Sequence, residues 1–299
     1  MRIAISGARG LVGSELVTQL GVDNDITRLV RRRERAKRGT AYWSPETGEV
    51  DAHALEGHDV VIHLAGESLF GVWTAKRKDA IRRSRVQGTQ LLASALASLD
   101  RPPALLITAS AVGIYGDRPP DQKVDESASG GSGFLAGVVR GWEAATEPAD
   151  VAGIRVAHLR FGLVISERGG IVKAMLPAFR LGLGAVVGPG SQAWSWIALH
   201  ELPHIVRHVI ANDTLRGPVN TTAPEAVTSA EFSRALGRAL HRPVLLHIPA
   251  ALVRLAPGGM GEELAIASAR VEPAKLIASG YAFRHPVLEP ELRRILGRD

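Results

Sequence analysis

The 299-residue sequence contains no cysteine. This absence excludes disulfide-stabilised scaffolds, zinc sites built on thiolates, iron–sulfur clusters and cysteine nucleophiles. Long apolar runs are also missing: the longest uncharged stretch covers residues 181–199, and its four glycines and one proline would interrupt a membrane-spanning helix. The first ten residues carry only a short apolar run, unlike a signal segment, so we expect a cytoplasmic protein with no membrane partner.

Positive charge is in slight excess and is carried by arginine. Lys and Arg number 36 against 30 acidic residues, which gives a net charge of +6, and only six of the 36 are lysines. So small a surplus indicates an anionic ligand only where the arginines cluster. Hydrophobic residues make up 45% of the chain. This fraction can bury a sizeable core, so the composition is that of a globular protein.

The first 165 residues alternate short apolar runs with longer helical patterns, which is typical of a parallel sheet covered by helices on both faces. Strands are predicted at Ile3–Ser6, Asp25–Val30, Asp59–Ala65, Ala104–Thr108 and Arg155–Phe161. Helices are predicted at Leu11–Leu20, Ile81–Leu99 and Gly133–Ala145. We therefore expect an α/β fold with a Rossmann-like, doubly wound parallel sheet.

The pattern changes after this point, where glycine-rich and aromatic segments run through residues 182–196 and a short strand follows at Pro218–Thr221. Further helices are predicted at Leu202–Ile210, Thr228–Leu240, Ala250–Leu255, Pro273–Ser279 and Glu289–Leu296. We expect a Rossmann core over residues 1–165, to which the chain returns at about 199–224. Residues 166–299 would form most of a smaller C-terminal α/β substrate domain.

A glycine-rich loop lies between the first strand and the first helix. Glycine permits a tight turn, close approach of a pyrophosphate and close packing of helix on strand, while the helix N-terminus offers N–H groups and a positive dipole to phosphates. The alternative is a glycine turn without a ligand. The predicted dinucleotide-binding residues in this loop are Gly7, Arg9, Gly10, Leu11, Val12 and Gly13.

The end of the second strand decides between two dinucleotides. An NAD site places an acidic residue there for the ribose 2′-hydroxyl, but this strand is followed by Arg31, Arg32 and Arg33 and by further basic residues at 35, 37 and 38. Guanidinium groups bind a 2′-phosphate through charge-assisted hydrogen bonds. We therefore predict NADP(H), bound by Arg31 and Arg32 with Arg9 on the same side. The alternative is a solvated basic loop. A nucleic-acid partner is not expected, because no aromatic residues interleave with the arginines.

Nine stretches of the chain carry a resemblance to a known family. They are SGARGLVGSEL (6–16), DVVIHLAGESL (59–69), WTAKRKDAIRRSRVQGTQLL (73–92), TASAVGIYGD (108–117), FLAGVVRGWEAA (134–145), LRFGLVISERGG (159–170), FRLGLGAVVGPGSQAWSWI (179–197), GPVNTTAPEAVTSAEFSRALGRALHRP (217–243) and VEPAKLIASGYAFRHPVL (271–288). With them the chain resembles the atypical, epimerase-like branch of the extended short-chain dehydrogenases/reductases, whose members have their own C-terminal domain.

The resemblance implies a Rossmann core that binds NADP(H) and a C-terminal domain that forms the substrate cleft. It implies that Leu64, Ala65 and Gly66 line the cofactor. It also implies that Ser110 is the catalytic serine at the end of its strand and that Arg160 lies near the nicotinamide.

The catalytic Tyr-x-x-x-Lys pair of that superfamily is absent. The matching positions hold Phe134 and Val138, which lack the phenol and the ammonium that pass a proton as hydride moves. Tyr115 is the predicted catalytic substitute, and Glu143 and Lys123 are further groups within conceivable reach. The alternative for Tyr115 is a buried tyrosine whose hydroxyl is satisfied by neighbours.

The run His200-Glu201-Leu202-Pro203-His204 matches the zinc motif HExxH. That motif needs both histidines on one face of a helix. A proline at 203 instead predicts the first turn of a helix, which leaves His200 outside it. We expect no metal site. Gln192 and Trp194–Trp196 either frame a substrate pocket or pack between the domains.

The sequence therefore predicts an NADP(H)-binding, atypical short-chain oxidoreductase or epimerase-like protein. It would transfer a hydride to or from a small-molecule substrate, with Ser110 and Tyr115 as catalytic residues. The alternative, favoured by the missing pair, is a sensor or interaction protein that binds NADPH without turnover. The substrate and the oligomeric state, a homodimer included, are left open.

Overall fold

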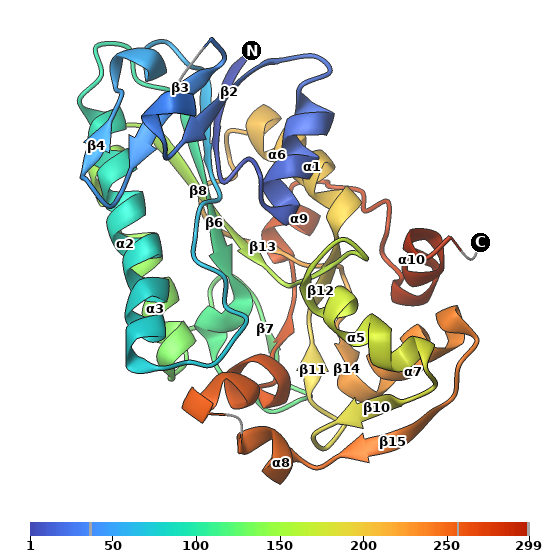
Figure 1. The fold of residues 1–299 in the computed structure, drawn as a ribbon. Coiled ribbons are helices and arrows are strands. Elements are labelled where there is room, and N and C mark those ends of the chain that lie inside the picture. The colour runs from blue at the N-terminus through green and yellow to red at the C-terminus, as the bar shows by residue number, and fades with distance from the viewer. Residues whose placement is uncertain (36–37, 256, 298–299) are drawn as a thin grey trace.

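The computed structural model describes residues 1–35, 38–255 and 257–297. Its centre is an eight-stranded sheet in the order β13-β8-β6-β5-β1-β2-β3-β4 (Figure 1). Neighbouring strands are parallel except for β3 and β4. These strands are β1 (Arg2–Ser6), β2 (Asp25–Val30), β3 (Thr40–Ser44), β4 (Glu49–Val50), β5 (Val60–His63), β6 (Leu105–Ala111), β8 (Arg155–Phe161) and β13 (Gly217–Thr221). The predicted α/β fold with a Rossmann-like parallel sheet is confirmed.

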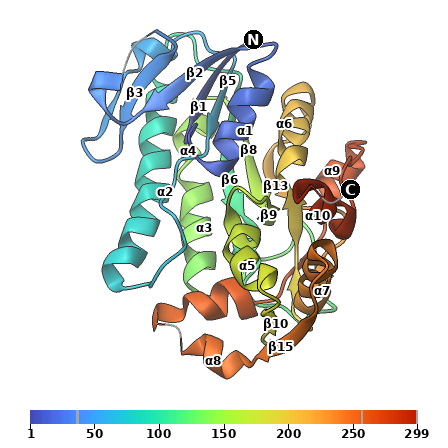
Figure 2. The same cartoon turned by 45° about the vertical axis from the view of Figure 1, so that its right-hand side comes forward.

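Helices cover both faces of the sheet, because successive side chains of a strand point to opposite sides. Ile3 and Ile5 of β1 belong to a core cluster with residues of α1 (Leu11–Leu20) and α6 (Leu202–Ala211). Ala4, between them, belongs to a cluster on the other face with residues of α2 (Ala75–Ala97) and α4 (Glu147–Val151), and α3 (Phe134–Ala144) packs beside α2 (Figures 1 and 2).

A second core lies in the C-terminal part of the chain. Trp194, Trp196 and Phe232 pack there with apolar residues of α5 (Gly170–Arg180), α7 (Ser229–Leu240) and α10 (Leu288–Ile295). Four two-stranded sheets accompany the two cores: β9 (Leu163–Ile165) with β12 (Trp196–Ala198), β10 (Gly184–Val187) with β15 (Val244–Ile248), β11 (Ala193–Trp194) with β14 (Val227–Thr228), and β7 (Lys123–Val124) with β16 (Arg270–Val271). The short helix α8 (Ala250–Arg254) completes this part, whereas α9 (Ala274–Ala278) packs on β13 and contributes Leu276 to the main core (Figure 2).

After entering the second core, the chain returns to the main core at residues 197–219 and again at Leu276. Within the expected return at residues 199–224, α6 contributes Ile205, Val206 and Val209 to the main core, and β13 extends the main sheet beside β8. The domain limits themselves stay a prediction. In the described ranges, no helix has both the length and the apolar composition that a membrane crossing requires.

Several elements differ from the sequence prediction, among them helices α2 and α5 and strand β3. Helix α2 begins at Ala75 rather than Ile81, because Thr74 caps it by accepting a 3.2 Å hydrogen bond from the backbone N–H of Arg77. Helix α5 was not predicted, and it tolerates Pro177 in its interior. Strand β3 was not predicted either, although its aromatic run is bounded by Gly39 and Pro45, which is a strand signal.

Candidate functional site

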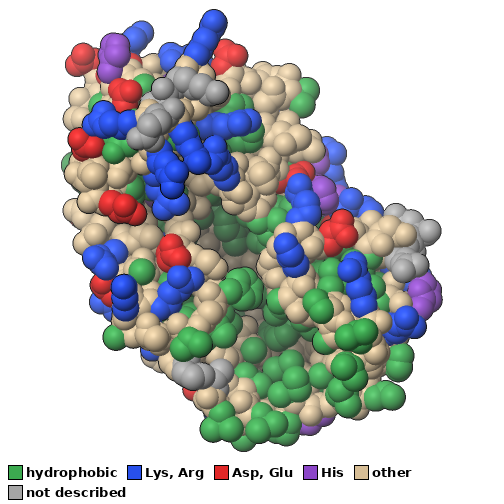
Figure 3. Space-filling model, in the orientation of Figure 1, with side chains coloured by type: hydrophobic (Ala, Val, Ile, Leu, Met, Phe, Trp, Pro, Cys, Tyr) green, Lys and Arg blue, Asp and Glu red, His purple; other side chains and the backbone are tan. Residues whose placement is uncertain are grey.

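The carboxyl ends of the parallel strands bring most of the predicted site residues to one edge of the sheet. The glycine loop follows β1, the arginines follow β2, and Leu64–Gly66 follow β5, while Ser110 and Arg160 lie at the ends of β6 and β8. In open α/β sheets this edge is where ligands bind. Figure 3 shows a hollow lined with apolar side chains in the middle of one face, with a group of basic side chains next to it.

The glycine loop is built so that no side chain fits inside it. Gly7 has a positive φ of 67°, and a Cβ on Gly13 would lie 2.2 Å from the carbonyl oxygen of Gly7. The N–H of Gly10 donates to that same oxygen at 2.8 Å, and Gly10 then caps α1. The first turn of α1, with Leu11 and Val12 half-buried, therefore begins directly behind the loop. Its N-terminal N–H groups and dipole favour an anion at this position.

Ser6 fixes the strand end next to this loop. Its Oγ accepts hydrogen bonds from the backbone N–H groups of Leu64 (3.1 Å) and Ala65 (3.3 Å). The hydroxyl proton therefore goes to Nδ1 of His63, 2.7 Å away, and burial lowers the pKa of His63 to about 4. Because a Cβ on Gly7 would lie 2.8 Å from the carbonyl carbon of Leu64, the two loops touch backbone to backbone. Sequence reasoning missed Ser6 and His63, although Ser6 ends one predicted strand and His63 lies within another.

The predicted phosphate-binding arginines are exposed at the same edge. The side chains of Arg9, Arg31 and Arg32 make no hydrogen bond or ion pair with any residue that the structure describes. Arg33 differs, because it pairs with Glu49 at 2.9 Å and lies over the ring of Tyr42. Lys37 lies outside the described residues. Unpaired guanidinium groups beside a glycine loop are available to a phosphate.

Ser110 belongs to a buried polar cluster at the ends of β6 and β8. Its hydroxyl donates to Oε1 of Glu143 at 2.6 Å, and Arg160 donates to both carboxylate oxygens of Glu143 at 2.8 Å. Burial alone would raise the pKa of Glu143, but the hydrogen bonds from Arg160 and Ser110 and the charge of Arg160 outweigh burial and lower it. Glu143 is therefore held as a carboxylate, with Ser110 as one of its donors.

Tyr115 lies on the other side of Arg160 and is fully buried. Its hydroxyl donates to Oδ1 of Asn220 at 2.7 Å and accepts from Nη1 of Arg160 at 2.9 Å. Burial raises the pKa of Tyr115, and the neighbouring Arg160 opposes this only in part. The catalytic assignment of Tyr115 stays a prediction, but this geometry favours a positioning role. Lys123 does not join the cluster, since it is exposed and pairs with Glu272 at 2.5 Å.

The positions of the missing catalytic pair are filled by apolar packing. Phe134 meets the ring of Trp73 edge to face at 5.2 Å, and Val138 is 2% exposed in the same cluster. Glu263, from the C-terminal part, accepts hydrogen bonds from the backbone N–H groups of Phe134 (2.9 Å) and Leu135 (2.7 Å). This carboxylate therefore caps α3 at the helix end where the superfamily has its tyrosine.

The residues proposed for a substrate pocket lie in the interior. Trp194 and Trp196 are 4% and 1% exposed in the C-terminal core, which favours the packing alternative. Gln192 is 2% exposed and donates to the carbonyl oxygens of Val187 and Ala265, both at 2.9 Å. It therefore joins two segments of the C-terminal part.

Two polar residues of the HExxH match, His200 and Glu201, make separate contacts. As predicted, Pro203 lies in the first turn of α6, and His200 precedes the helix and contacts Glu15 at 3.1 Å. Glu201 is fully buried and accepts hydrogen bonds from the hydroxyl of Tyr281 and from the backbone N–H groups of Arg284 and His285. No group of three or more potential metal ligands exists within the described ranges.

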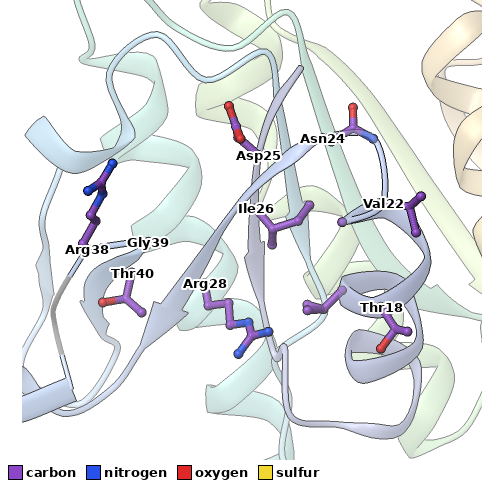
Figure 4. Close-up of a pocket in the computed structure, with 11 residues that line it drawn as sticks. Thr18, Val22, Asn24, Asp25, Ile26, Arg28, Arg38, Gly39 and Thr40 are labelled. Atoms are coloured by element: carbon purple, nitrogen blue, oxygen red, sulfur yellow. The ribbon is translucent and has the colours of Figure 1, made fainter.

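A shallow pocket of about 520 Å³ lies away from this edge, between α1, the start of β2 and the start of β3 (Figure 4). Thr18, Ile26, Arg28 and Thr40 line it. Among the described residues of the connection from β2 to β3, the helical structure is the short 3-10 helix Arg33–Arg35. The glycine loop does not line it.

Two family models match parts of the chain. Residues 3–220 match the model of the NAD dependent epimerase/dehydratase family. Residues 248–295 match a domain of unknown function, DUF1731.

Individual relatives cover the chain from end to end. Epimerase family protein Mb2239 of Mycobacterium bovis is 42% identical over 285 residues, which are 95% of this chain and 93% of the relative. Epimerase family protein YfhF of Bacillus subtilis is 32% identical over 300 residues, covering 99% of this chain and 98% of the relative. The crystal structure of human epimerase family protein SDR39U1 (isoform 2) with NADPH is similar with a TM-score of 0.90 at 30% identity, and both chains are covered completely.

Proposed function

The chain belongs to the NAD dependent epimerase/dehydratase family, and from this premise we propose that it is an NADP(H)-dependent oxidoreductase acting on a small molecule. One observation carries the proposal: the glycine loop, the unpaired arginines and the buried Ser110–Glu143 pair share one edge of the sheet. The human relative with a TM-score of 0.90 was crystallised with NADPH, which supports the choice of cofactor.

The residues at this edge fit a dinucleotide that carries an additional phosphate. The loop from Gly7 to Gly13 would hold the pyrophosphate. Its glycines have no Cβ atoms, which at Gly7 and Gly13 would collide with neighbouring backbone, so the loop stays tight and its backbone can approach the pyrophosphate closely. Arg31 and Arg32 would hold the 2′-phosphate. Leu64–Gly66, in backbone contact with Gly7, would line the nucleotide between the loop and Ser110.

NADP(H), when bound, supplies or accepts the hydride at the substrate carbon. The chain's own residues act on the substrate oxygen. Because Ser110 directs its proton to Glu143, its lone pairs are free to accept a hydrogen bond from a substrate hydroxyl. As that hydroxyl becomes a carbonyl, its proton moves to Ser110 and the serine proton moves to Glu143, so that charge and protons balance. In the reverse direction the same protons return to the carbonyl oxygen.

Arg160 and Tyr115 position this pair. Arg160 fixes the Glu143 carboxylate through two hydrogen bonds, and Tyr115 orients Arg160 through a third. Burial raises the pKa of Glu143, but Arg160 and Ser110 lower it by more. The carboxylate therefore holds a proton only transiently, and this favours rapid release of the proton.

Binding without turnover is the second candidate function. The apolar packing of Phe134 and Val138 favours it, because no phenol or ammonium stands where the superfamily has its proton donor.

The cofactor assignment predicts a selective loss. We expect Arg31→Ala with Arg32→Ala to weaken NADPH binding roughly 10- to 100-fold or more, since hydrogen bonds between charged groups contribute about 1.5–3 kcal/mol each. NADH binding would change little, because NADH has no 2′-phosphate. Calorimetric titration of both nucleotides measures this, and the matched control is Arg82→Ala with Arg83→Ala, which removes two exposed charges from α2. Equal losses for both nucleotides would refute the assignment.

Single-turnover kinetics separate the two candidate functions. Stopped-flow oxidation of bound NADPH is followed with a panel of carbonyl compounds and quinones, and reduction of NADP⁺ with the corresponding alcohols. We expect Ser110→Ala to lower the rate at least ~100-fold without changing NADPH affinity. Ser233→Ala is the control, because Ser233 is buried and its Oγ has no partner among the described residues. No turnover with any compound would favour binding without catalysis.

A further inference from the structure

Strand β15 lies at the edge of a sheet, and most of its side chains are exposed. Among the described residues it pairs only with β10, in a two-stranded sheet. Leu245 is 82% exposed, Leu246 48% and Ile248 40%. Helix α7 packs mainly on β10, so the outer strand has little cover. Sheets of two strands are marginal in water, and a further strand on β15 would stabilise this one.

The segments next to β15 extend its apolar surface. Four leucines that are each more than half exposed flank the strand, two before β10 and two in or just after α8: Leu181, Leu183, Leu252 and Leu255. The first two lie near the start of β15, because Gly184 of β10 pairs with Val244. Figure 3 shows apolar side chains gathered at this lower end of the molecule, where Figure 1 places α8 and β15, away from the glycine loop. Exposed apolar patches of this kind mark interaction sites.

The backbone of β15 has one unpaired edge. The carbonyl oxygen of Ile248 accepts a 2.9 Å hydrogen bond from the N–H of Gly188, so the backbone groups of Ile248 face β10. Because these groups alternate in direction along a strand, those of Leu246 also face β10 and those of His247 point away from it. Leu245 has no partner on β10, since the register shifts at this residue. Leu245 and His247 therefore offer N–H and C=O groups to another strand.

The side chains of β15 favour a protein strand as the occupant. Exposed edges are usually protected by charged residues or proline within the strand, but Val244–Ile248 contains neither. The imidazole of His247 is engaged within its own chain, 2.6 Å from the carbonyl oxygen of Gly188. Without charge, the strand cannot select a partner by charge complementarity. A lipid surface would cover the leucines but could not satisfy the free N–H and C=O groups.

We propose that β15 is the interface between two copies of this chain, paired antiparallel about a two-fold axis at Leu246. Two-fold symmetry requires antiparallel pairing, because only antiparallel strands bring identical bonding residues opposite each other. Pro243 and Pro249 lie three residues to either side of Leu246 and have no N–H to donate. An axis at Leu246 therefore uses the available donors: Leu245 of each copy exchanges hydrogen bonds with His247 of the other.

This pairing joins the two small sheets into one of four strands. Leu246 of one copy then lies directly opposite Leu246 of the other, at the closely spaced positions of an antiparallel pair. The flanking leucines of both copies gather around the same axis. The inference goes beyond the proposed function, because neither the dinucleotide nor the substrate takes part in the interface.

The oligomeric state of the full chain tests the proposal by sedimentation velocity over a range of concentrations. We expect a dimer for wild type. Leu246→Lys and Leu246→Glu should each raise the dissociation constant roughly 100-fold or more, because two like charges meet at the axis. An equimolar mixture of the two variants should restore the dimer, since opposite charges then meet. Val22→Lys is the matched control: Val22 is 82% exposed between α1 and β2, and its substitution should leave the dimer intact.

A wild-type monomer at every concentration would overturn the proposal, as would a dimer that tolerates either Leu246 variant. Failure of the mixture to associate would overturn the axis at Leu246. Monomeric wild type that binds vesicles of phosphatidylcholine and phosphatidylserine would assign the leucines to a lipid surface instead. Thermal unfolding checks the fold of each variant, and Leu245→Pro, which removes one donor of the new pairing, replaces a charged variant that does not fold. Unchanged NADPH affinity in the variants separates this interface from the dinucleotide site, and a wild type that binds no NADPH would refute the proposed function alone.

Discussion

Among single residues, Glu143 holds the polar centre of the site together. Its side chain is 14% exposed, and it is the ion-pair partner of Arg160, whose side chain is 7% exposed. Removing one partner of a buried ion pair leaves the other charge without compensation, which costs more than the pair contributes. Glu143 therefore determines both the stability of this region and the orientation of Ser110.

We expect Glu143→Gln to lower the free energy of unfolding by about 3–5 kcal/mol at pH 7. In the folded wild type, burial raises the pKa of Glu143. Hydrogen bonds from Arg160 and Ser110 outweigh burial, so the net pKa lies below the ordinary 4.5. The carboxylate therefore stabilises the fold fully above about pH 4.5, and this stabilisation is lost as the pH falls through the lower folded pKa. Urea unfolding across this range measures it.

The difference between wild type and Glu143→Gln should narrow as the pH decreases. The control is Glu46→Gln, the same chemical change at an exposed position, for which we expect an effect below about 0.5 kcal/mol. If Glu143→Gln is as stable as wild type at pH 7, the Glu143–Arg160 pair contributes nothing to stability.

Among the elements, helix α3 depends on a residue far away in the sequence. The N-cap Gly133 has no side chain to accept from the first N–H groups, and Glu263 replaces it with two hydrogen bonds at 2.9 and 2.7 Å. A negative charge at this end also interacts favourably with the helix dipole. The contact fastens the segment around Glu263 across the start of α3, beside Phe134.

We expect Glu263→Ala to lower the free energy of unfolding by about 0.5–2 kcal/mol, the usual cost of losing an N-cap. Amide hydrogen exchange should accelerate in the first turn of α3. Glu262→Ala is the matched control: Glu262 pairs with Arg254 at 3.2 Å, and both side chains are more than half exposed, so that pair contributes little. Unchanged exchange at Phe134 and Leu135 would refute the capping role.

Elements with strong local signals were predicted well. Helix α7 is one example, because Thr228 and Glu231 form a capping box that the sequence displays directly. Helix α5 was missed because Pro177 and the flanking glycines obscure its apolar face, and that face is stabilised only by packing against the C-terminal core. Local sequence patterns therefore predict an element when its capping residues and its hydrophobic period indicate the same helix or strand. They fail when packing against the rest of the protein stabilises an element that its own sequence does not favour.

In the whole molecule, buried carboxylates join the two cores. Glu15 of α1 contacts Arg168 and His200, which precede α5 and α6. Glu201 attaches the segment containing Tyr281, Arg284 and His285, which leads to α10. These contacts hold the C-terminal core against the layer that carries the glycine loop.

We expect Glu201→Gln to lower the free energy of unfolding by about 3 kcal/mol or more, since a neutral amide cannot replace a carboxylate that accepts several hydrogen bonds. Urea unfolding and hydrogen exchange at residues 281–285 measure the loss. Glu225→Gln, an exposed change of the same kind, is the control. If the amides of Arg284 and His285 exchange as slowly in Glu201→Gln as in wild type, Glu201 does not attach the C-terminal segment.

The sequence by itself determined the features that depend on neighbouring residues. The glycine loop, the arginines after β2 and the parallel sheet could all be predicted, because turn chemistry and periodicity act over a few residues. The absence of the Tyr-x-x-x-Lys pair followed from the family resemblance instead. Only the tertiary structure decided which side chains meet: Ser110 with Glu143, Tyr115 with Asn220, and Arg85 with Gly66. Such contacts depend on how whole elements pack, and no local period encodes that packing.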